Sequence, residues 1–204
     1  MKKLLIAPLL LFLLVYCCAI PAADSPQDLV RETSDRMIEA LRNNRDQLQK
    51  NPAQIYDLVN DIVLPHFDFT VMSRWVLGKY WRQATPDQRE RFTDEFRTLM
   101  VRTYSQALLE YSNEEIVFPP SPPLASDATE ATVRCEFHPK SGQPIPINYS
   151  VHRMNNGWKI YDVTVDGVSL VTNYRSTFAD QIRTQGMDAT IDSLAQRNRQ
   201  NLTS

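Results

Sequence analysis

The chain has 204 residues, 43% of them hydrophobic, and a formal charge of −2 at pH 7. This length suits one substantial domain, or one domain with a helical annex. A mildly acidic chain has no electrostatic reason to bind nucleic acid, and the sequence contains no polybasic stretch for an anionic membrane surface. We therefore expect a single domain without a nucleic-acid partner.

Residues 1–23 have the order of a secretory signal peptide. Two lysines precede an apolar run, residues 4–18, and small residues follow it. The run is too short to span a membrane with ordinary flanks. We predict export and cleavage near residue 23, which lowers the formal charge to −4 because two lysines and no acid are lost. The alternative is a lipoprotein anchored through Cys17 or Cys18, but the tyrosine before Cys17 stands where such processing requires a small residue.

Residues 25–111 are predicted to be helical, because capping signals and prolines separate apolar stripes at helical spacing. Ser25 is an N-cap candidate, Pro65 is a stop, and Gly78 is a C-cap candidate. Thr85 and Gln88 form a capping box that opens the longest helix. The expected helices cover about 25–49, 52–64, 66–78 and 85–111.

The apolar period changes to two after the prolines at 119–123. Residues 131–137 and 145–151 alternate apolar and polar side chains, which indicates half-buried antiparallel strands. A third strand is expected from Trp158 to Val165. A three-residue loop with Met154 opposite Trp158 and Gly157 in the left-handed position gives a register with apolar pairs on one face. The expected pairs are Val151–Tyr161, Tyr149–Val163 and Ile147–Val165.

The segment 158–186 supplies apolar surface from a strand and from the helix that follows it. After a turn at Asp166–Gly167, the short run Val168–Val171 leads into an amphipathic helix that ends at Gly186. A last helix is expected from Asp188. The sheet is therefore expected at about 115–165 and the C-terminal helices at about 168–198.

The sequence contains no convincing catalytic or metal-binding motif. No glycine belongs to a phosphate-binding loop, and the three histidines lack metal-ligand spacing. Ser169 is better explained as a capping serine than as a nucleophile, because Val171 replaces the second glycine of the elbow motif. Cys135 alternates with apolar residues and is interpreted as a buried apolar side chain. We expect no enzyme activity, no metal and no cofactor.

Large apolar side chains are more numerous than one element needs. Residues 67–81 are crowded with them, and the long helix and the sheet add others. A close-packed core is the simpler interpretation of these residues alone. The pattern cannot distinguish a filled core from a lined cavity.

Two sets of residues match the pattern of a known family. In the C-terminal half they are Trp158–Val163, Asp166–Val171, Asn173–Arg175 and Phe178. In the helical half they are Asp68, Phe69, Leu77, Gly78, Trp81, Ala84, Thr85, Gln88, Phe92, Phe96 and Tyr104. The chain closely resembles the MlaC family, periplasmic phospholipid-shuttle proteins of Gram-negative bacteria that are also called toluene-tolerance proteins. It departs from the family at Asp166, where glutamate is common, and at Cys135.

The resemblance implies an α+β fold for residues 24–204. A small, strongly curved antiparallel sheet of about four strands, cystatin-like, would be wrapped by helices around a deep apolar pocket. The pocket would hold phospholipid acyl chains, with the headgroup at its mouth. Asn173 and Arg175 are candidates for headgroup contact. The residues expected to line the pocket are Phe69, Met72, Leu77, Phe96, Met100, Tyr104, Tyr149, Val163, Val168, Leu170 and Tyr174.

The resemblance also implies a role and partners. The protein would carry diacyl phospholipid across the periplasm and so maintain the lipid asymmetry of the outer membrane. Its partners would be an outer-membrane lipoprotein–porin complex like MlaA and an inner-membrane ABC transporter like MlaFEDB. Two alternatives stay open: a periplasmic adaptor or chaperone that binds protein partners without lipid, and a small hydrolase that uses Ser169 with His152.

Overall fold

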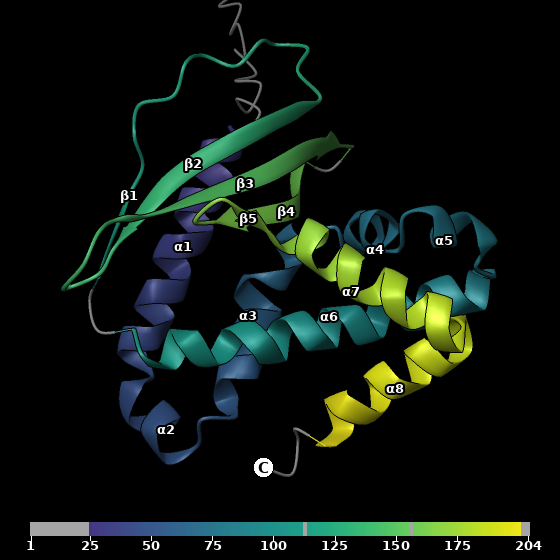
Figure 1. Ribbon diagram of the computed structural model, residues 1–204. Coiled ribbons are helices and arrows are strands. Elements are labelled where there is room, and N and C mark those ends of the chain that lie inside the picture. The colour runs from purple at the N-terminus through teal and green to yellow at the C-terminus, as the bar shows by residue number, and fades with distance from the viewer. Residues whose placement is uncertain (1–24, 112–113, 156, 201–204) are drawn as a thin grey trace, which may run out of the picture.

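The computed structural model describes residues 25–111, 114–155 and 157–200 (Figure 1). The predicted signal peptide and its cleavage site lie outside the described residues. The helices are α1 (Pro26–Asn43), α2 (Arg45–Lys50), α3 (Gln54–Ile62), the short 3-10 helix η1 (Leu64–His66), α4 (Phe69–Leu77), α5 (Lys79–Gln83), α6 (Pro86–Leu109), α7 (Leu170–Gln185) and α8 (Met187–Gln200). The strands are β1 (Glu115–Val117), β2 (Glu130–His138), β3 (Ile145–Met154), β4 (Gly157–Val165) and β5 (Val168–Ser169). None of the described helices combines the length and the apolar character that a membrane span requires.

The predicted helix starts are confirmed by their capping hydrogen bonds. The Ser25 hydroxyl accepts the N–H of Asp28 at 3.1 Å, and α1 begins there. Thr85 and Gln88 form the reciprocal capping box at the start of α6. One predicted helix is instead divided in the structure, because the first is interrupted at Asn44. Gly78 is the C-cap of α4 as predicted, with a φ of +54°, and the short helix α5 that follows it was not expected.

The five strands form one antiparallel sheet in the order β1-β2-β3-β4-β5. The predicted α+β class with a small antiparallel sheet is therefore confirmed. The sheet has five strands where about four were expected, because the three residues of β1 and the two of β5 each add a short edge. Pairing of β5 with β4 brings the start of α7 against the sheet.

The predicted register between β3 and β4 is confirmed in one half. Tyr149 lies opposite Val163, and Ile147 opposite Val165. Near the turn the prediction is wrong. The structure pairs Val151 with Ile160 and Met154 with Gly157.

A β-bulge at Tyr161 explains both outcomes. Ser150 pairs with Asp162 and Val151 with Ile160, so Tyr161 has no partner on β3. Its ring leaves the face of Val163 and lies edge-on to the ring of His152, with centroids 5.5 Å apart. A tighter turn plus one bulged residue gives the same register beyond the bulge as the predicted three-residue loop. The alternation of apolar residues could not distinguish these two arrangements.

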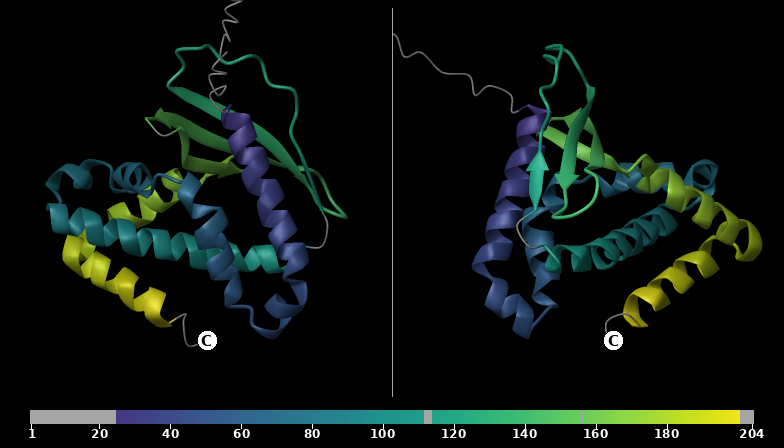
Figure 2. Two further views of the ribbon diagram at one scale, coloured as in Figure 1. Left: turned by 180° about the vertical axis from the view of Figure 1, so that it is seen from behind. Right: turned by 60° about the vertical axis from the view of Figure 1, so that its left-hand side comes forward.

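The helices cover the sheet unequally. The first half of α1 packs on the sheet through Val30, which joins a buried cluster with Val133, Val151 and Trp158, and Figure 2 shows α1 crossing this side in the view from behind. α7 leads away from the sheet, and α8 returns along α6 (Figure 1). By contrast, α6 itself makes only sparse contact with any described strand.

Candidate functional site

The residues expected to line a pocket fall into two adjoining apolar clusters. Met72, Leu77, Phe96 and Met100 are buried in the first cluster, between α4, α6 and α7, with Phe69 and Tyr174 packed on it. Val163 is buried in the second cluster, against the sheet, with Tyr149 and Leu170 packed on it. The structure thus brings these nine residues together. The other two, Tyr104 and Val168, keep 40% and 57% of their surface exposed.

Leu170 and Tyr174 connect the two clusters. They lie one turn apart on α7, so they share one face of that helix. Leu170 contacts the sheet cluster, and the Tyr174 ring packs edge-on to that of Phe96, with centroids 5.5 Å apart. The Tyr104 hydroxyl, on α6, lies near that of Tyr174. Burial and this hydroxyl together raise the pKa of Tyr104.

Asp162 fixes the start of α7 on the sheet. Its carboxylate accepts the Ser169 hydroxyl at 2.6 Å, and it also accepts the N–H groups of Val171 at 3.1 Å and Val163 at 2.8 Å. Three hydrogen bonds to one carboxylate hold the strand and the helix in a defined relation. The positions of Leu170 and Tyr174 follow from this anchor.

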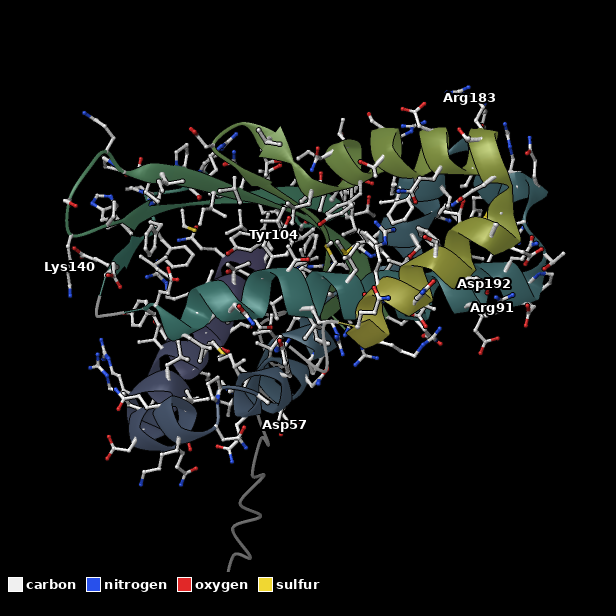
Figure 3. The ribbon with its side chains drawn as sticks, turned by 60° about the horizontal axis from the view of Figure 1, so that its bottom comes forward. Asp57, Arg91, Tyr104, Lys140, Arg183 and Asp192 are labelled. Carbon is white, nitrogen blue, oxygen red and sulfur yellow. The ribbon has the colours of Figure 1, made fainter. Side chains whose placement is uncertain are left out.

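The apolar row on α6 is closed at one end and open at the other. Phe92 and Phe96 are fully buried, Met100 is 7% exposed, and Tyr104 is 40% exposed. These residues recur every fourth position and therefore share one face of the helix. Figure 3 shows Tyr104 between α6 and the sheet.

The apolar face of the sheet has the same gradient. Val151 is fully buried and Val163 is 9% exposed, whereas Val165 and its partner Val168 are 37% and 57% exposed. Burial raises the pKa of Tyr149, on this face, although its side chain is only half-buried.

One residue of this open region was missed by sequence reasoning. Val165 is 37% exposed, beside Val168. The signal was present, because alternation placed Val165 on the apolar face. A residue belongs to the open region because it is exposed, and a sequence pattern does not report exposure.

A separate cavity of about 250 Å³ lies between α2 and the end of α6. None of the predicted lining residues borders it. Its walls are mostly apolar and include two arginines and a glutamine, and they consist of Leu41, Arg42, Arg45, Leu48, Gln49, Pro52, Leu108, Leu109 and Tyr111. Apart from the apolar stripes of the helices beside it, nothing in the sequence indicated this cavity.

The candidate headgroup residues Asn173 and Arg175 are exposed on α7, on either side of Tyr174. The guanidinium of Arg175 lies against the backbone of Gly78, 3.0 Å from where a Cβ would stand. Asn173 makes no side-chain hydrogen bond within the described part of the chain.

Ser169 and His152 do not meet as the hydrolase alternative requires. The Ser169 hydroxyl caps α7, accepting the Thr172 N–H at 3.0 Å and donating to Asp162. His152 Nε2 lies 3.1 Å from Asp68 Oδ2 instead. Across the described ranges, no group of three or more His, Cys, Asp or Glu side chains is arranged to hold a metal ion.

The fold and these residues define a class: α+β proteins in which a small antiparallel sheet and a long helix each carry an apolar row that is buried at one end and exposed at the other. A family model, the MlaC protein, matches residues 31–196. The chain therefore belongs to the MlaC family.

Related proteins and a solved structure agree with this assignment. The toluene tolerance protein Ttg2D of Pseudomonas putida is 34% identical over 190 residues, 90% of this chain and 87% of its own length. The intermembrane phospholipid transport system binding protein MlaC of Haemophilus influenzae is 26% identical over 178 residues, 86% of this chain and 83% of its own. The phospholipid-binding protein of Ralstonia solanacearum, solved with a phospholipid, superposes with a TM-score of 0.79 at 30% identity, covering 88% of this chain and 99% of that one.

Proposed function

We propose that this protein is a periplasmic phospholipid carrier that holds acyl chains between the α6 row and the apolar face of the sheet. The observation that carries the proposal is the pair of matching gradients: both surfaces are closed at one end and expose large apolar side chains, Tyr104 and Val168, at the other. The relative solved with a phospholipid and the family support the same conclusion. No catalytic step is part of this function.

The energetics explain why enclosure is required. Two acyl chains hold about thirty methylenes at about 0.8 kcal/mol each, so their exposure to water costs more than about 20 kcal/mol. A bilayer is as apolar as the carrier's interior, so transfer between the two is near balance and reversible. Release into water is too slow to be useful, and lipid leaves only while the carrier is docked.

The family suggests the proposed partners, and such partners meet this requirement. An outer-membrane lipoprotein–porin complex and an inner-membrane ABC transporter would each accept or deliver the lipid, and the exchange would maintain outer-membrane asymmetry. Asn173 and Arg175 are the proposed headgroup contacts. They flank Tyr174, which lies near Tyr104 at the open end of the row.

Native mass spectrometry of the protein purified from cells tests the proposal. We expect a mass that exceeds the chain by one diacyl phospholipid. Tyr104→Arg, a change at a partly exposed position, puts a cation among the acyl chains and should lower the lipid-bound fraction by about tenfold or more. Leu124→Arg, at a loop position that is 43% exposed, is the matched control and should retain lipid. A folded wild-type protein without lipid would favour the protein-binding adaptor instead.

A further inference from the structure

The outer face of α4 and α5 carries an exposed tryptophan among basic side chains. Trp75 is 51% exposed, and it takes part in no hydrogen bond or ring contact with the described residues. Half-exposed tryptophans are uncommon, because the indole is among the most apolar side chains. Arg74, Lys79 and Arg82 are also exposed on these two helices.

The fold adds a fourth basic side chain, that of Arg175, to this face. Arg74 and Trp75 precede Gly78 by four and three residues, so they lie one helical turn from it. The guanidinium of Arg175, from α7, lies on Gly78, with Nε and Nη2 each 3.0 Å from the position that a Cβ would occupy. We call Arg74, Trp75, Lys79, Arg82 and Arg175 the basic Trp75 face.

Acidic side chains are missing from the segments that build this face. Neither residues 69–86 nor residues 170–179 contain Asp or Glu. The flanking acids are engaged elsewhere: Asp68 caps α4 and faces His152, Asp87 lies 3.6 Å from Arg91, and Asp180 lies 3.4 Å from Arg183. The basic Trp75 face therefore has a formal charge of +4 in a chain whose net charge is negative.

We infer that the basic Trp75 face is a docking surface for an anionic phospholipid membrane. Bases attract the phosphate-rich surface, and a tryptophan beside them inserts at the headgroup level, where its amphipathic ring is favoured. Four bases and one indole give weak, reversible binding, which suits a carrier that must detach again. The linear sequence has no polybasic stretch, and the charge becomes concentrated only because α4, α5 and α7 pack together.

This inference extends the proposed function, because the inner faces of α4 and α7 supply Met72, Leu77, Leu170 and Tyr174 to the proposed lipid interior. The same two helices would then meet the membrane on one side and the acyl chains on the other.

Sedimentation with lipid vesicles tests the inference. Vesicles of phosphatidylglycerol mixed with phosphatidylcholine should bind the protein, vesicles of phosphatidylcholine alone should bind it much less, and high salt should weaken the difference. Each base near an anionic surface contributes about a fivefold factor, so Arg74→Glu with Lys79→Glu should reduce partitioning by roughly twentyfold or more. Trp75→Ala should reduce it severalfold without changing its salt dependence.

Matched variants control for net charge and apolar loss. Arg134→Glu with Lys140→Glu removes two exposed bases from the sheet region, and Leu124→Ala removes an exposed apolar side chain from a loop. Both should bind vesicles as the wild type does. The inference would be overturned if these controls lost as much binding as the variants of the basic Trp75 face, or if the protein bound both vesicle types equally. It would also be overturned if the protein bound neither vesicle type, and the occupant of the face would then be an acidic protein surface. Lipid content measured on the same samples separates the two proposals, because vesicle binding does not depend on bound cargo.

Discussion

Gly78 is a position where the backbone disfavours a side chain and the space for one is tight. Its φ of +54° is adopted readily only by glycine, and a Cβ would stand 3.0 Å from the Arg175 guanidinium, which would have to shift. Gly78→Ala should lower the free energy of unfolding by about 1–3 kcal/mol. Urea denaturation measures this change in the free energy of unfolding. Gly142→Ala is the matched control, because Gly142 also has a positive φ, of +107°, but only ordinary contact with Pro139. Equal losses would show that the contact with Arg175 costs nothing.

Cys135 makes the protein sensitive to alkaline pH. Burial raises the pKa of its thiol from 9.0 to about 11. Between these two values the folded chain holds a proton that the unfolded chain has lost, so stability falls as pH rises through this range. The urea midpoint should decrease from pH 9 to pH 11, and Cys135→Ala should decrease less. The thiol should also react slowly with an alkylating reagent at pH 8 until the chain is unfolded. A rapid reaction in the folded state would contradict the burial.

Between elements, the junction of β4 with α7 depends on one carboxylate. Asp162→Ala removes the acceptor of three hydrogen bonds and leaves the Val171 and Val163 N–H groups without it. We expect a loss of about 2–3 kcal/mol in unfolding free energy. Asp180→Ala, which removes an exposed acid from α7, should lower the free energy of unfolding by less than about 0.5 kcal/mol. Similar losses for both variants would mean that Asp162 is not an anchor.

The attachment of α8 to α6 combines a buried and an exposed interaction. Asn198, 4% exposed, donates to the Glu95 carbonyl at 2.9 Å, and Arg91 pairs with Asp192 at 2.6 Å on the surface, as Figure 3 shows. Asn198→Ala should cost about 1–3 kcal/mol and Arg91→Ala about 1 kcal/mol or less. Hydrogen exchange of the α8 amides measures both. A larger effect of Arg91→Ala than of Asn198→Ala would mean that the exposed ion pair, and not the buried hydrogen bond, is the main attachment of α8.

Sequence reasoning succeeded for elements whose signals are local. The capping box at Thr85 and the N-cap at Ser25 need only neighbouring residues, and both are present in the structure. It failed at Tyr161, because a bulge in β4 preserves the alternation on both sides of itself. It did not anticipate the interruption at Asn44, whose side-chain amide donates to the Ala40 carbonyl at 2.8 Å and ends α1.

For the molecule as a whole, nine of the predicted lining residues lie in two adjoining apolar clusters, but the sequence did not predict their exposure. Met72 and Tyr104 both stand at apolar positions of predicted helices, yet Met72 is fully buried and Tyr104 is 40% exposed. The difference arises because α6 runs past the sheet without packing closely on it. The basic Trp75 face was missed for a related reason, since its charges come from three helices.

A crystal structure of the protein purified from cells, with its lipid retained, tests the central claim most directly. The account predicts acyl-chain density between α6 and the sheet, in contact with Tyr104, Tyr149 and Val168. Density confined to the cavity between α2 and the end of α6, or an interior filled by protein side chains alone, would contradict it.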